Sequence, residues 1–367
     1  MNKTNEIFAF HLYNDFSGSP KVLKSVLNGL TRKGYHLTLF TSKNGILDSL
    51  EENRNITIKE VPYKFQADSK IKTALKFFFA NVRYLFLVLF ASYKTKPIIY
   101  INTIMPWGAA LGAKLRGLSI IYHYHENAYV KGKLYRVLTR LMEKIADKII
   151  CVSKTQAETL KRNENVFIVS NGLDNEIGSR VCYNPTKSFQ RKNILMLSSL
   201  KGFKGVNEFC ILARTLPQYK FTLVLNDSED NCMEFRSANK CDDITNLSVY
   251  SRTSDVSRFY NDASIVVNLS DKRKFIETFG LTIIEGMAAG LPVIVPSAGG
   301  PAEIVKDGEN GFIADVENLS LIKNRINYIF SSYEIYLQMS KRAYDSAKNF
   351  TEAAMIDKIS DIIDQLN

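Results

Sequence analysis

The sequence lacks the marks of a secreted, disulfide-stabilised or zinc-binding chain. It contains only five cysteines, an odd number, and none of them lies in a CxxC or Cys/His spacing. Neither a disulfide framework nor a zinc site is therefore indicated. The N-terminal residues also lack the long apolar stretch of a secretory signal. These absences together favour a cytoplasmic protein.

Long uncharged hydrophobic runs are missing as well. The strongest candidate, residues 75–93, is interrupted by Arg83, and the uncharged stretch after it covers only the ten residues 84–93. A helix needs about 20 apolar residues to span a bilayer, so this segment is not transmembrane. A helix buried in a domain is one interpretation. Its seven aromatic residues, with lysines on both sides, also suit a helix that lies at a membrane interface.

Acidic residues are scarce in the first half of the chain. Residues 1–170 carry 26 Lys and Arg against 12 Asp and Glu, whereas residues 171–367 carry 22 against 25. The net charge of +11 therefore arises entirely in the first half. Such asymmetry is typical of a surface that meets an anionic partner, such as nucleic acid, a membrane face or a phosphorylated substrate.

The length of 367 residues exceeds the roughly 250–300 residues at which a single core stops growing. Apolar strands alternate with helices twice, first over residues 7–153 and again over residues 193–297. This order predicts two Rossmann-like α/β domains with parallel sheets, joined by a polar, turn-rich linker at 175–192. The expected parts are residues 1–175, residues 176–350 and a last helix over residues 351–367.

The densest chemical signal follows a strand in the second domain. A loop carries Glu277, and a helix is expected to begin near Phe279 or Gly280. The amides of Phe279, Gly280 and Leu281 would then lie at the positive end of the helix dipole, which is a site for a diphosphate. Gly280 has no Cβ, so a phosphate or a sugar can approach its backbone closely. Glu285 lies further along the same helix, and the two carboxylates can bind hydroxyls at the two ends of one ligand.

This segment resembles the retaining glycosyltransferases of the GT-B fold, family 4. The signature of that family is Glu, seven residues and Glu, followed by a Gly-Gly-x-x-Glu turn, which here is residues 299–303. The resemblance implies that Glu277 lies beside the donor sugar and that Glu285 binds the ribose hydroxyls. Glu303 either braces the start of its own helix or belongs to the site.

Weaker motifs of the same family follow one another in the expected order. Lys204, before a glycine, resembles the donor-phosphate segment, and Gly18 resembles the first glycine loop. Residues 170–174 resemble the interdomain segment. Residues 123–126 (HYHE) resemble the segment that carries the histidine of the N-terminal domain.

Two positions need a choice. His123 and His125 face the same side of a strand, and His125 lies nearer its carboxyl end, where ligands bind in open α/β sheets. We therefore expect His125 to be the catalytic histidine and His123 to be a core histidine. The arginine of the donor-phosphate segment is absent, because its place reads Ser-Ser at 198–199. Lys201 is expected to take part of its role in binding the donor.

The resemblance implies a GT-B architecture, with two Rossmann-like domains facing across a cleft and a C-terminal helix that crosses back to the N-terminal domain. The N-terminal domain would bind the acceptor and the C-terminal domain the donor. The implied reaction moves a sugar from a UDP- or GDP-linked donor to a hydroxyl of a glycan or a lipid-linked acceptor, with retention. Its expected setting is bacterial surface polysaccharide or glycolipid assembly, and no cofactor is expected.

The departing diphosphate carries negative charge that something positive must stabilise. No DxD-type acidic motif follows a strand to hold a metal ion. We therefore expect a metal-independent enzyme in which Lys204, Lys201 and the helix amides stabilise the leaving group. The basic run 272–274 either adds to this or is simply exposed.

Two other classes of protein compete with this interpretation. A UDP-sugar epimerase-like GT-B enzyme needs acid–base side chains at the sugar carbon, and only His123 and His125 offer themselves. A nucleic-acid-binding module suits the positive first half, but the sequence lacks the interleaved aromatic and basic residues of a single-strand platform. It also leaves Glu277 and Glu285 unexplained. We expect no nucleic-acid partner, and we expect peripheral contact with the inner face of the cell membrane.

Overall fold

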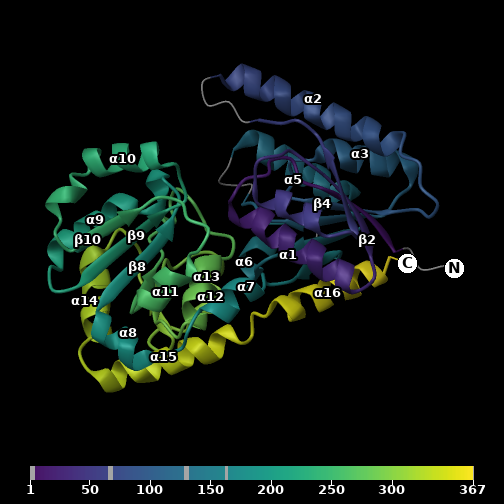
Figure 1. Ribbon diagram of the computed structural model, residues 1–367. Coiled ribbons are helices and arrows are strands. Elements are labelled where there is room, and N and C mark those ends of the chain that lie inside the picture. The colour runs from purple at the N-terminus through teal and green to yellow at the C-terminus, as the bar shows by residue number, and fades with distance from the viewer. Residues whose placement is uncertain (1–4, 65–68, 128–131, 162–163, 367) are drawn as a thin grey trace. The chain divides into compact units, whose positions relative to one another are not determined.

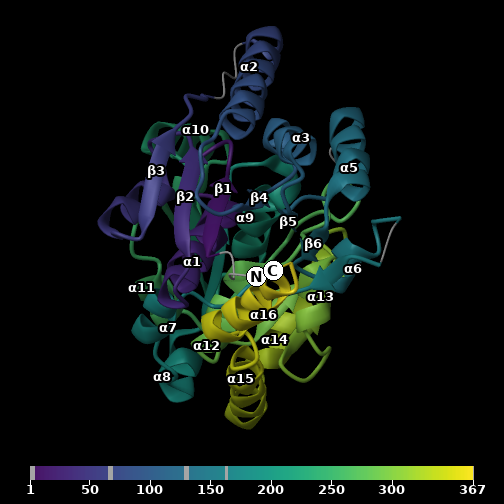
Figure 2. The ribbon, with the colours of Figure 1, turned by 90° about the vertical axis from the view of Figure 1, so that its right-hand side faces the viewer.

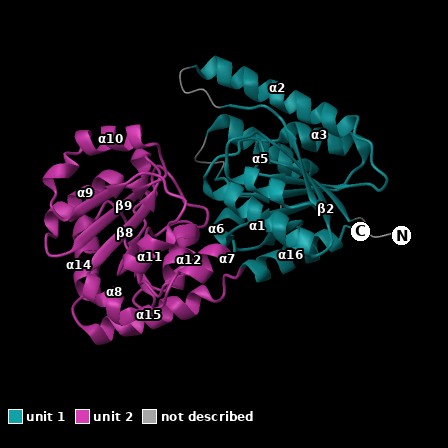
Figure 3. Cartoon of the chain, in the orientation of Figure 1, with its two compact units in different colours: residues 1–172, 352–367 teal, residues 173–351 magenta. Residues whose placement is uncertain are grey.

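The computed structural model describes residues 5–64, 69–127, 132–161 and 164–366. The chain forms two compact units, and the N-terminal unit also contains the end of the chain (Figure 3). Unit 1 comprises residues 1–172 and 352–367, and unit 2 comprises residues 173–351. Each unit is a parallel sheet with helices on both faces (Figure 1).

The sheet of unit 1 has seven strands in the order β3-β2-β1-β4-β5-β6-β7, and each neighbouring pair is parallel. Strands β4 and β5 are buried along their whole length, as expected when helices cover both faces of a parallel sheet. The strands are β1 (Glu6–Phe10), β2 (His36–Thr41), β3 (Ile56–Glu60), β4 (Ile98–Asn102), β5 (Ile120–Tyr124), β6 (Lys148–Cys151) and β7 (Val166–Ile168).

Helices cover both faces of this sheet. Helices α2, α3 and α5 lie side by side on one face, and α1 and α16 lie together on the other (Figure 2). The helices are α1 (Gly18–Arg32), η1 (Ile46–Glu52), α2 (Lys70–Leu89), α3 (Trp107–Arg116), α5 (Lys133–Ile145), α6 (Lys154–Ala157) and α16 (Glu352–Asp364).

The C-terminal helix α16 belongs to unit 1 because it packs on α1. A Cβ atom on Gly29 of α1 would lie only 2.0 Å from Cδ1 of Ile356, so the two helices meet at a residue without a side chain. Polar contacts border this meeting point. They are Arg32 with Glu352 at 2.7 Å, Lys33 with Asp357 at 2.7 Å, and the hydroxyl of Tyr35 with Asp364 at 2.6 Å.

The sheet of unit 2 has six parallel strands in the order β10-β9-β8-β11-β12-β13. Its strands are β8 (Asn193–Ser198), β9 (Lys220–Leu225), β10 (Leu247–Tyr250), β11 (Ile265–Val267), β12 (Val293–Val295) and β13 (Gly311–Ile313). Its helices are α7 (Asn175–Arg180), α8 (Pro185–Arg191), η2 (Gly202–Lys204), α9 (Val206–Thr215), α10 (Glu229–Ala238), η3 (Cys241–Asp243), α11 (Ser257–Asp262), α12 (Leu281–Ala288), α13 (Gly300–Ile304), α14 (Leu319–Ile329) and α15 (Tyr333–Ala347).

The segment 175–192, expected to be a polar, turn-rich linker, instead forms the helices α7 and α8. Both helices have side-chain caps. Asp174 accepts hydrogen bonds from the amides of Glu176 and Ile177, and Asn184 accepts one from the amide of Lys187. Proline follows Asn184 at the first helical position, where its fixed φ favours a helix start. The polar residues that suggested a loop are therefore helix caps.

We predict that substitutions at Gly29 and Ile356 have coupled effects on stability, because the two residues share the same space between α1 and α16. Gly29→Ala should lower the free energy of unfolding of unit 1, because overpacking costs about 1–3 kcal/mol, and better helix propensity offsets only ~1 kcal/mol of it. In the double variant with Ile356→Ala, the alanine at 29 should cost much less. Denaturant unfolding of the wild type, the two single variants and the double variant measures this. Additive effects would contradict the coupling.

Candidate functional site

The polar loops of unit 2 meet where its strand order reverses. Strands β8 and β11 are neighbours, but the chain leaves β8 toward β9 and leaves β11 toward β12, on the other side. Ligands of open parallel sheets bind at such a switch point, outside the carboxyl ends of the strands. The segment after β8 carries Lys204 in η2, and the loop after β11 carries Glu277.

Lys204 and Glu277 form an ion pair across this switch point. The ammonium of Lys204 donates to Oε2 of Glu277, and both side chains are about four-fifths buried. The ammonium also lies 4.5 Å from the ring centroid of Phe275, which stacks on Phe203 at 4.7 Å. A cation over an aromatic face is held electrostatically. Two residues that the sequence placed in separate roles therefore contact one another.

Helix α12 begins one residue later than the latest start expected from the sequence. Gly280 is its N-cap, with φ of 97°, and this left-handed conformation favours glycine. The amides of Phe279, Gly280 and Leu281 lie at the start of this helix, and the structure gives them no acceptor among the described residues. They lie where the dipole of α12 favours an anion, whereas the side chain of Phe279 is buried.

The Gly-Gly turn holds the Glu277 loop in place. A Cβ on Gly299 would lie 2.2 Å from the carbonyl oxygen of Glu277, and a Cβ on Gly300 would lie 2.3 Å from that of Thr278. The amide of Gly300 donates to the carbonyl of Glu277 at 2.9 Å. Any larger residue would push this loop away, so the two glycines shape the site through the backbone. Glu303 is exposed in the short helix α13 that follows.

Glu285 is buried inside unit 2. The residue is 4% exposed, and Oε2 accepts a hydrogen bond of 2.5 Å from the hydroxyl of Tyr260 in α11. Tyr260 is fully buried, and burial together with the adjacent Glu285 raises the pKa of its hydroxyl well above the usual value. The hydroxyl therefore stays protonated and fixes the orientation of this carboxylate. Sequence reasoning missed Tyr260, which gives no motif signal of its own.

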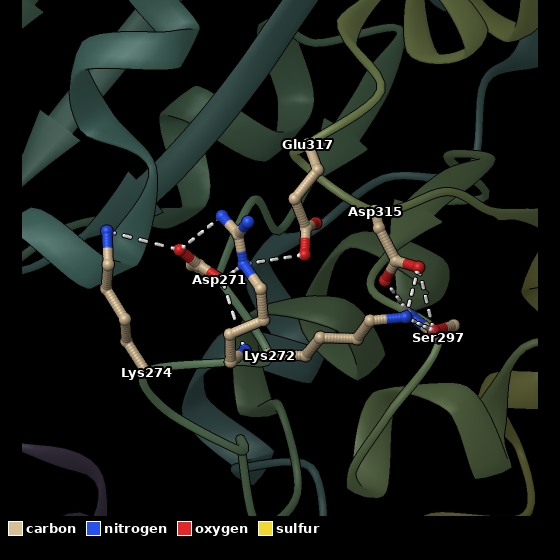
Figure 4. A network of polar contacts seen from close by, with 7 residues as sticks. Asp271, Lys272, Lys274, Ser297, Asp315 and Glu317 are labelled. Carbon is tan, nitrogen blue, oxygen red and sulfur yellow. Dashed lines mark hydrogen bonds and ion pairs between the residues drawn. The ribbon is translucent and has the colours of Figure 1, made fainter.

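The basic run 272–274 is neutralised by acidic residues of unit 2 (Figure 4). The guanidinium of Arg273 binds Asp271 at 2.9 Å and Glu317 at 2.9 Å, and Lys274 binds Asp271 at 3.2 Å. Asp271 is buried, and its hydrogen bond to Arg273 holds the pKa of the carboxyl well below the usual range.

The remaining cation of the run, Lys272, is also paired. Its ammonium binds Asp315 at 2.6 Å and the hydroxyl of Ser297 at 2.8 Å (Figure 4). The sequence left two interpretations open for the run 272–274, a contribution to phosphate binding or simple exposure. Arg273 and Lys274 are exposed, and all three cations are paired with carboxylates. The run braces the loop that leads to Glu277.

Two further predicted residues lie at loop–helix junctions. Lys201 is exposed, and it precedes η2 at the carboxyl end of β8. Its carbonyl accepts the amide of Lys204 at 2.8 Å. Gly18 is the exposed first residue of α1, at the carboxyl end of β1 in unit 1.

A hydrogen-bonded chain of side chains fixes His125 in unit 1. Nε2 of His125 lies 3.0 Å from Oδ1 of Asn102, whose amide nitrogen lies 3.0 Å from Nδ1 of His11 and 3.3 Å from the carbonyl of Ser19. Nε2 of His11 in turn donates to the carbonyl of Tyr13 at 2.9 Å. Since the two carbonyls accept, the chain assigns each ring its proton. His125 is neutral with its proton on Nε2, and its Nδ1 is a hydrogen-bond acceptor.

His123 is a core residue, as the sequence suggested. It is fully buried in β5, its Nδ1 lies 2.7 Å from the hydroxyl of Tyr100, and burial lowers its pKa to about 3. Burial also lowers the pKa of His11 to about 4 and that of His125 well below its usual value. The rings of His123 and His125 have centroids 4.2 Å apart. All three histidines are therefore uncharged at neutral pH.

Sequence reasoning missed His11 and Asn102. His11 directly follows β1, and Asn102 ends β4, so both lie at the switch point of the unit 1 sheet between β1 and β4. A polar residue after each apolar strand was the signal available, but it becomes informative only once the strand order is known.

Across the described residues, His, Cys, Asp and Glu side chains form no group of three that could hold a metal ion. None of the described helices combines the length and apolar character needed to cross a membrane.

Two Rossmann-like units in one chain, each with its polar residues at a switch point, define a GT-B enzyme. Two family profiles match these units, Glycosyltransferase Family 4 over residues 16–177 and Glycosyl transferases group 1 over residues 185–346. The chain belongs to this family of retaining, nucleotide-sugar-dependent glycosyltransferases. The family assignment decides against the epimerase and nucleic-acid-binding alternatives.

Similar proteins extend over nearly the whole chain. An uncharacterized glycosyltransferase of Haemophilus influenzae is 24% identical over 355 residues, which are 93% of this chain and 94% of that protein. Sucrose-phosphate synthase from Thermosynechococcus elongatus has a TM-score of 0.79 at 18% identity and covers 98% of both chains. Anabaena HepE in complex with UDP-glucose has a TM-score of 0.78 at 17% identity and covers 97% of this chain and 98% of its own. These structures confirm the fold.

We predict that the buried histidines make stability depend on pH. In the unfolded chain a histidine has a pKa of about 6.5, while His11 and His123 have folded values of about 4 and about 3. As the pH falls from 6.5 toward 4, the unfolded chain takes up protons that the folded chain does not. Each such histidine should then lower the free energy of unfolding by about 1.4 kcal/mol per pH unit.

His123→Asn tests this, because asparagine can still pair with Tyr100 but does not titrate. Denaturant unfolding between pH 7 and about pH 4.5 measures the free energy of unfolding. This free energy should fall less steeply with pH in the variant than in the wild type, by the equivalent of close to one bound proton. Equal slopes in the two proteins would rule out His123 as a source of the pH dependence.

Proposed function

We propose that this chain transfers a sugar from a UDP- or GDP-linked donor to a hydroxyl of a glycan or lipid-linked acceptor, with retention. The proposed setting is bacterial surface polysaccharide or glycolipid assembly, with the protein in the cytoplasm and peripherally on the inner face of the membrane. The observation that carries the proposal is the Lys204–Glu277 ion pair at the switch point of unit 2. The UDP-glucose in the similar HepE structure supports a UDP-linked donor.

Unit 2 binds the donor in this proposal. The amides of residues 279–281 hold the diphosphate, and Glu285 binds the ribose hydroxyls through the carboxylate that Tyr260 orients. Lys201 and Lys204 bind the phosphates, and Glu277 lies beside the sugar. Its ion pair with Lys204 places a positive and a negative group where the sugar meets the diphosphate.

Unit 1 binds the acceptor and supplies His125 and the Gly18 loop. His125, which is neutral and bound to Asn102, is the proposed catalytic histidine of this unit. The acceptor is proposed to be lipid-linked because the surplus positive charge of the chain lies entirely within residues 1–170, and cationic surfaces bind anionic membranes.

The reaction exchanges one bond at the anomeric carbon for another. The bond from this carbon to the diphosphate oxygen breaks, and the acceptor hydroxyl attacks on the same face, which retains the configuration. The hydroxyl proton passes to a phosphate oxygen of the leaving nucleoside diphosphate. Negative charge grows on that group, and the Lys204 ammonium and the α12 amides stabilise it. Preorganised groups of this kind supply much of the catalysis in enzymes.

We predict that Glu285→Gln reduces the free energy of nucleotide binding by more than it reduces the free energy of unfolding. A hydrogen bond to a charged group contributes about 1.5–3 kcal/mol, so the dissociation constant for UDP or GDP should rise by roughly 10- to 100-fold. Titration calorimetry with each nucleotide measures the effect and identifies the base. Tyr260→Phe is the matched control, because it removes the partner of Glu285 but no nucleotide contact.

If both variants weaken the nucleotide equally, Glu285 acts only as a structural partner of Tyr260, and the ribose assignment is wrong. If neither UDP nor GDP binds the wild type, the choice of donor is wrong.

We predict that Lys204→Ala lowers turnover by about 100-fold, because a preorganised charge acts mainly in the transition state. A double-mutant cycle with Glu277→Ala separates two roles. If Lys204 only holds Glu277, its loss should have no further effect once Glu277 is alanine. If it stabilises the leaving diphosphate, turnover should fall further.

Initial rates of nucleoside diphosphate release, with and without EDTA, provide the measurement. Lys201→Ala should also lower the rate if Lys201 replaces the missing arginine, whereas Lys341→Ala, at an exposed site on α15, should not. Loss of activity in EDTA that Mg²⁺ or Mn²⁺ restores would overturn the metal-independent mechanism.

A further inference from the structure

Helix α2 has two apolar faces, and only one of them is buried. Ala80, Tyr84 and Val88 are buried and belong to the core of unit 1, and α2 packs along α3. The other face consists of large apolar side chains that are each 50–78% exposed. We call these side chains the α2 stripe: Ile71, Leu75, Phe78, Phe79, Phe86 and Phe90.

The stripe is continuous along the helix. At about 100° per residue, its six members fall within an arc of about 120°. They extend from the first turn to the C-cap Phe90 of a 20-residue helix, a length of about 30 Å. An apolar surface of this size on a folded chain marks a place where another apolar phase binds.

Basic residues border the stripe on one side. Lys72, Lys76 and Arg83 lie within about 40° of one another around the helix axis, next to the stripe, and all three are exposed. Helix α2 contains no acidic residue. The layer formed by α2, α3 and α5 (Figure 2) contains ten Lys and Arg but a single Glu. That Glu, Glu143, is buried.

Helix α5, beyond α3 in this layer, repeats the combination. Leu134 and Val137 are half-exposed or more, and they alternate with the exposed Lys133, Arg136 and Arg140. The apolar residues and the cations thus extend over one face of unit 1. A protein partner needs no such excess of one charge, whereas the headgroups of anionic lipids attract it.

We propose that the α2 stripe and its basic border dock unit 1 on an anionic lipid surface. The helix lies in the plane of the interface, with its phenylalanines among the acyl chains and its cations among the lipid phosphates. This inference gives the lipid-linked acceptor of the proposed function a binding face. The inference rests on the proposed function only for the reason why lipid binding is useful. Lipid binding itself is measured without any transfer reaction.

Vesicle co-sedimentation tests the proposal. The wild type should bind vesicles that contain phosphatidylglycerol and should bind pure phosphatidylcholine vesicles much less. In Phe79→Ser/Phe86→Ser, each half-exposed phenylalanine withdrawn from the lipid should lower the partition coefficient about fivefold, or roughly 25-fold together. The matched control is Ile211→Ser/Met233→Ser, which changes two exposed apolar residues of unit 2 and should bind as the wild type does.

The basic border has a test of its own. Lys72→Glu/Lys76→Glu should lose binding to the anionic vesicles while keeping the wild-type melting temperature, since both side chains are exposed. Salt should weaken the binding of the wild type, because the Debye length falls to about 3 Å at 1 M.

The single tryptophan of the chain reports on the same face. Trp107 begins α3, and its ring centroid lies 6.5 Å from that of Phe78 in the stripe. Its emission should be quenched by brominated acyl chains in phosphatidylglycerol vesicles. The serine double variant should lose this quenching, and the unit 2 control should keep it.

Three results would overturn the proposal. The first is no binding to phosphatidylglycerol vesicles at low salt. The second is equal binding by the stripe variant and the unit 2 control. The third is a wild-type dimer that the stripe variant splits, without vesicle binding, which would make the stripe a contact between two copies. None of these results depends on nucleoside diphosphate release, so the proposed function can fail or stand separately.

Discussion

The parallel direction of every strand is the constraint from which the site follows. A parallel sheet returns the chain through a helix after each strand, so all the loops that follow strands emerge at one edge. Residues far apart in the sequence then gather there. Lys204 and Glu277 are 73 residues apart, and Asn102 and His11 are 91 residues apart. In each unit these groups meet beside the two central strands from which the chain departs in opposite directions.

Gathering charged groups at one edge has an energetic cost, which the chain meets with local partners. Each cation of the run 272–274 has a carboxylate, and the Tyr260 hydroxyl holds the buried carboxylate of Glu285. His11 and His125 of unit 1 take the neutral form instead, and they are linked through Asn102 in a chain of hydrogen bonds that reaches the backbone carbonyls of Tyr13 and Ser19. Polar groups held in this way need little rearrangement when a substrate arrives, which is the condition for electrostatic catalysis.

The sequence was informative where the signal is local. The repeated alternation of strands and helices predicted two domains with parallel sheets. The segment from Glu277 to Glu303 predicted a loop and a helix, with glycines at the helix start and in the turn that follows. Contacts that depend on strand order escaped it. Asn102 and Tyr260 show nothing until folding brings them to His125 and Glu285. The three-residue strands β7 and β13 are too short to show a periodic pattern, and the capped helices α7 and α8 looked like a loop because their caps are turn-forming residues.

The place of α16 has a consequence for synthesis. The chain leaves unit 1 after Gly172 and returns to it at Glu352, and the outgoing and returning segments meet where the amide of Leu173 donates to the carbonyl of Phe350 at 2.7 Å. Domains generally fold in the order in which they leave the ribosome. Here the N-terminal unit lacks the helix that covers α1 until residues 352–364 have been made, after the whole of unit 2. The unit that is made first is thus completed only after unit 2, and a premature stop before α16 would damage the N-terminal unit.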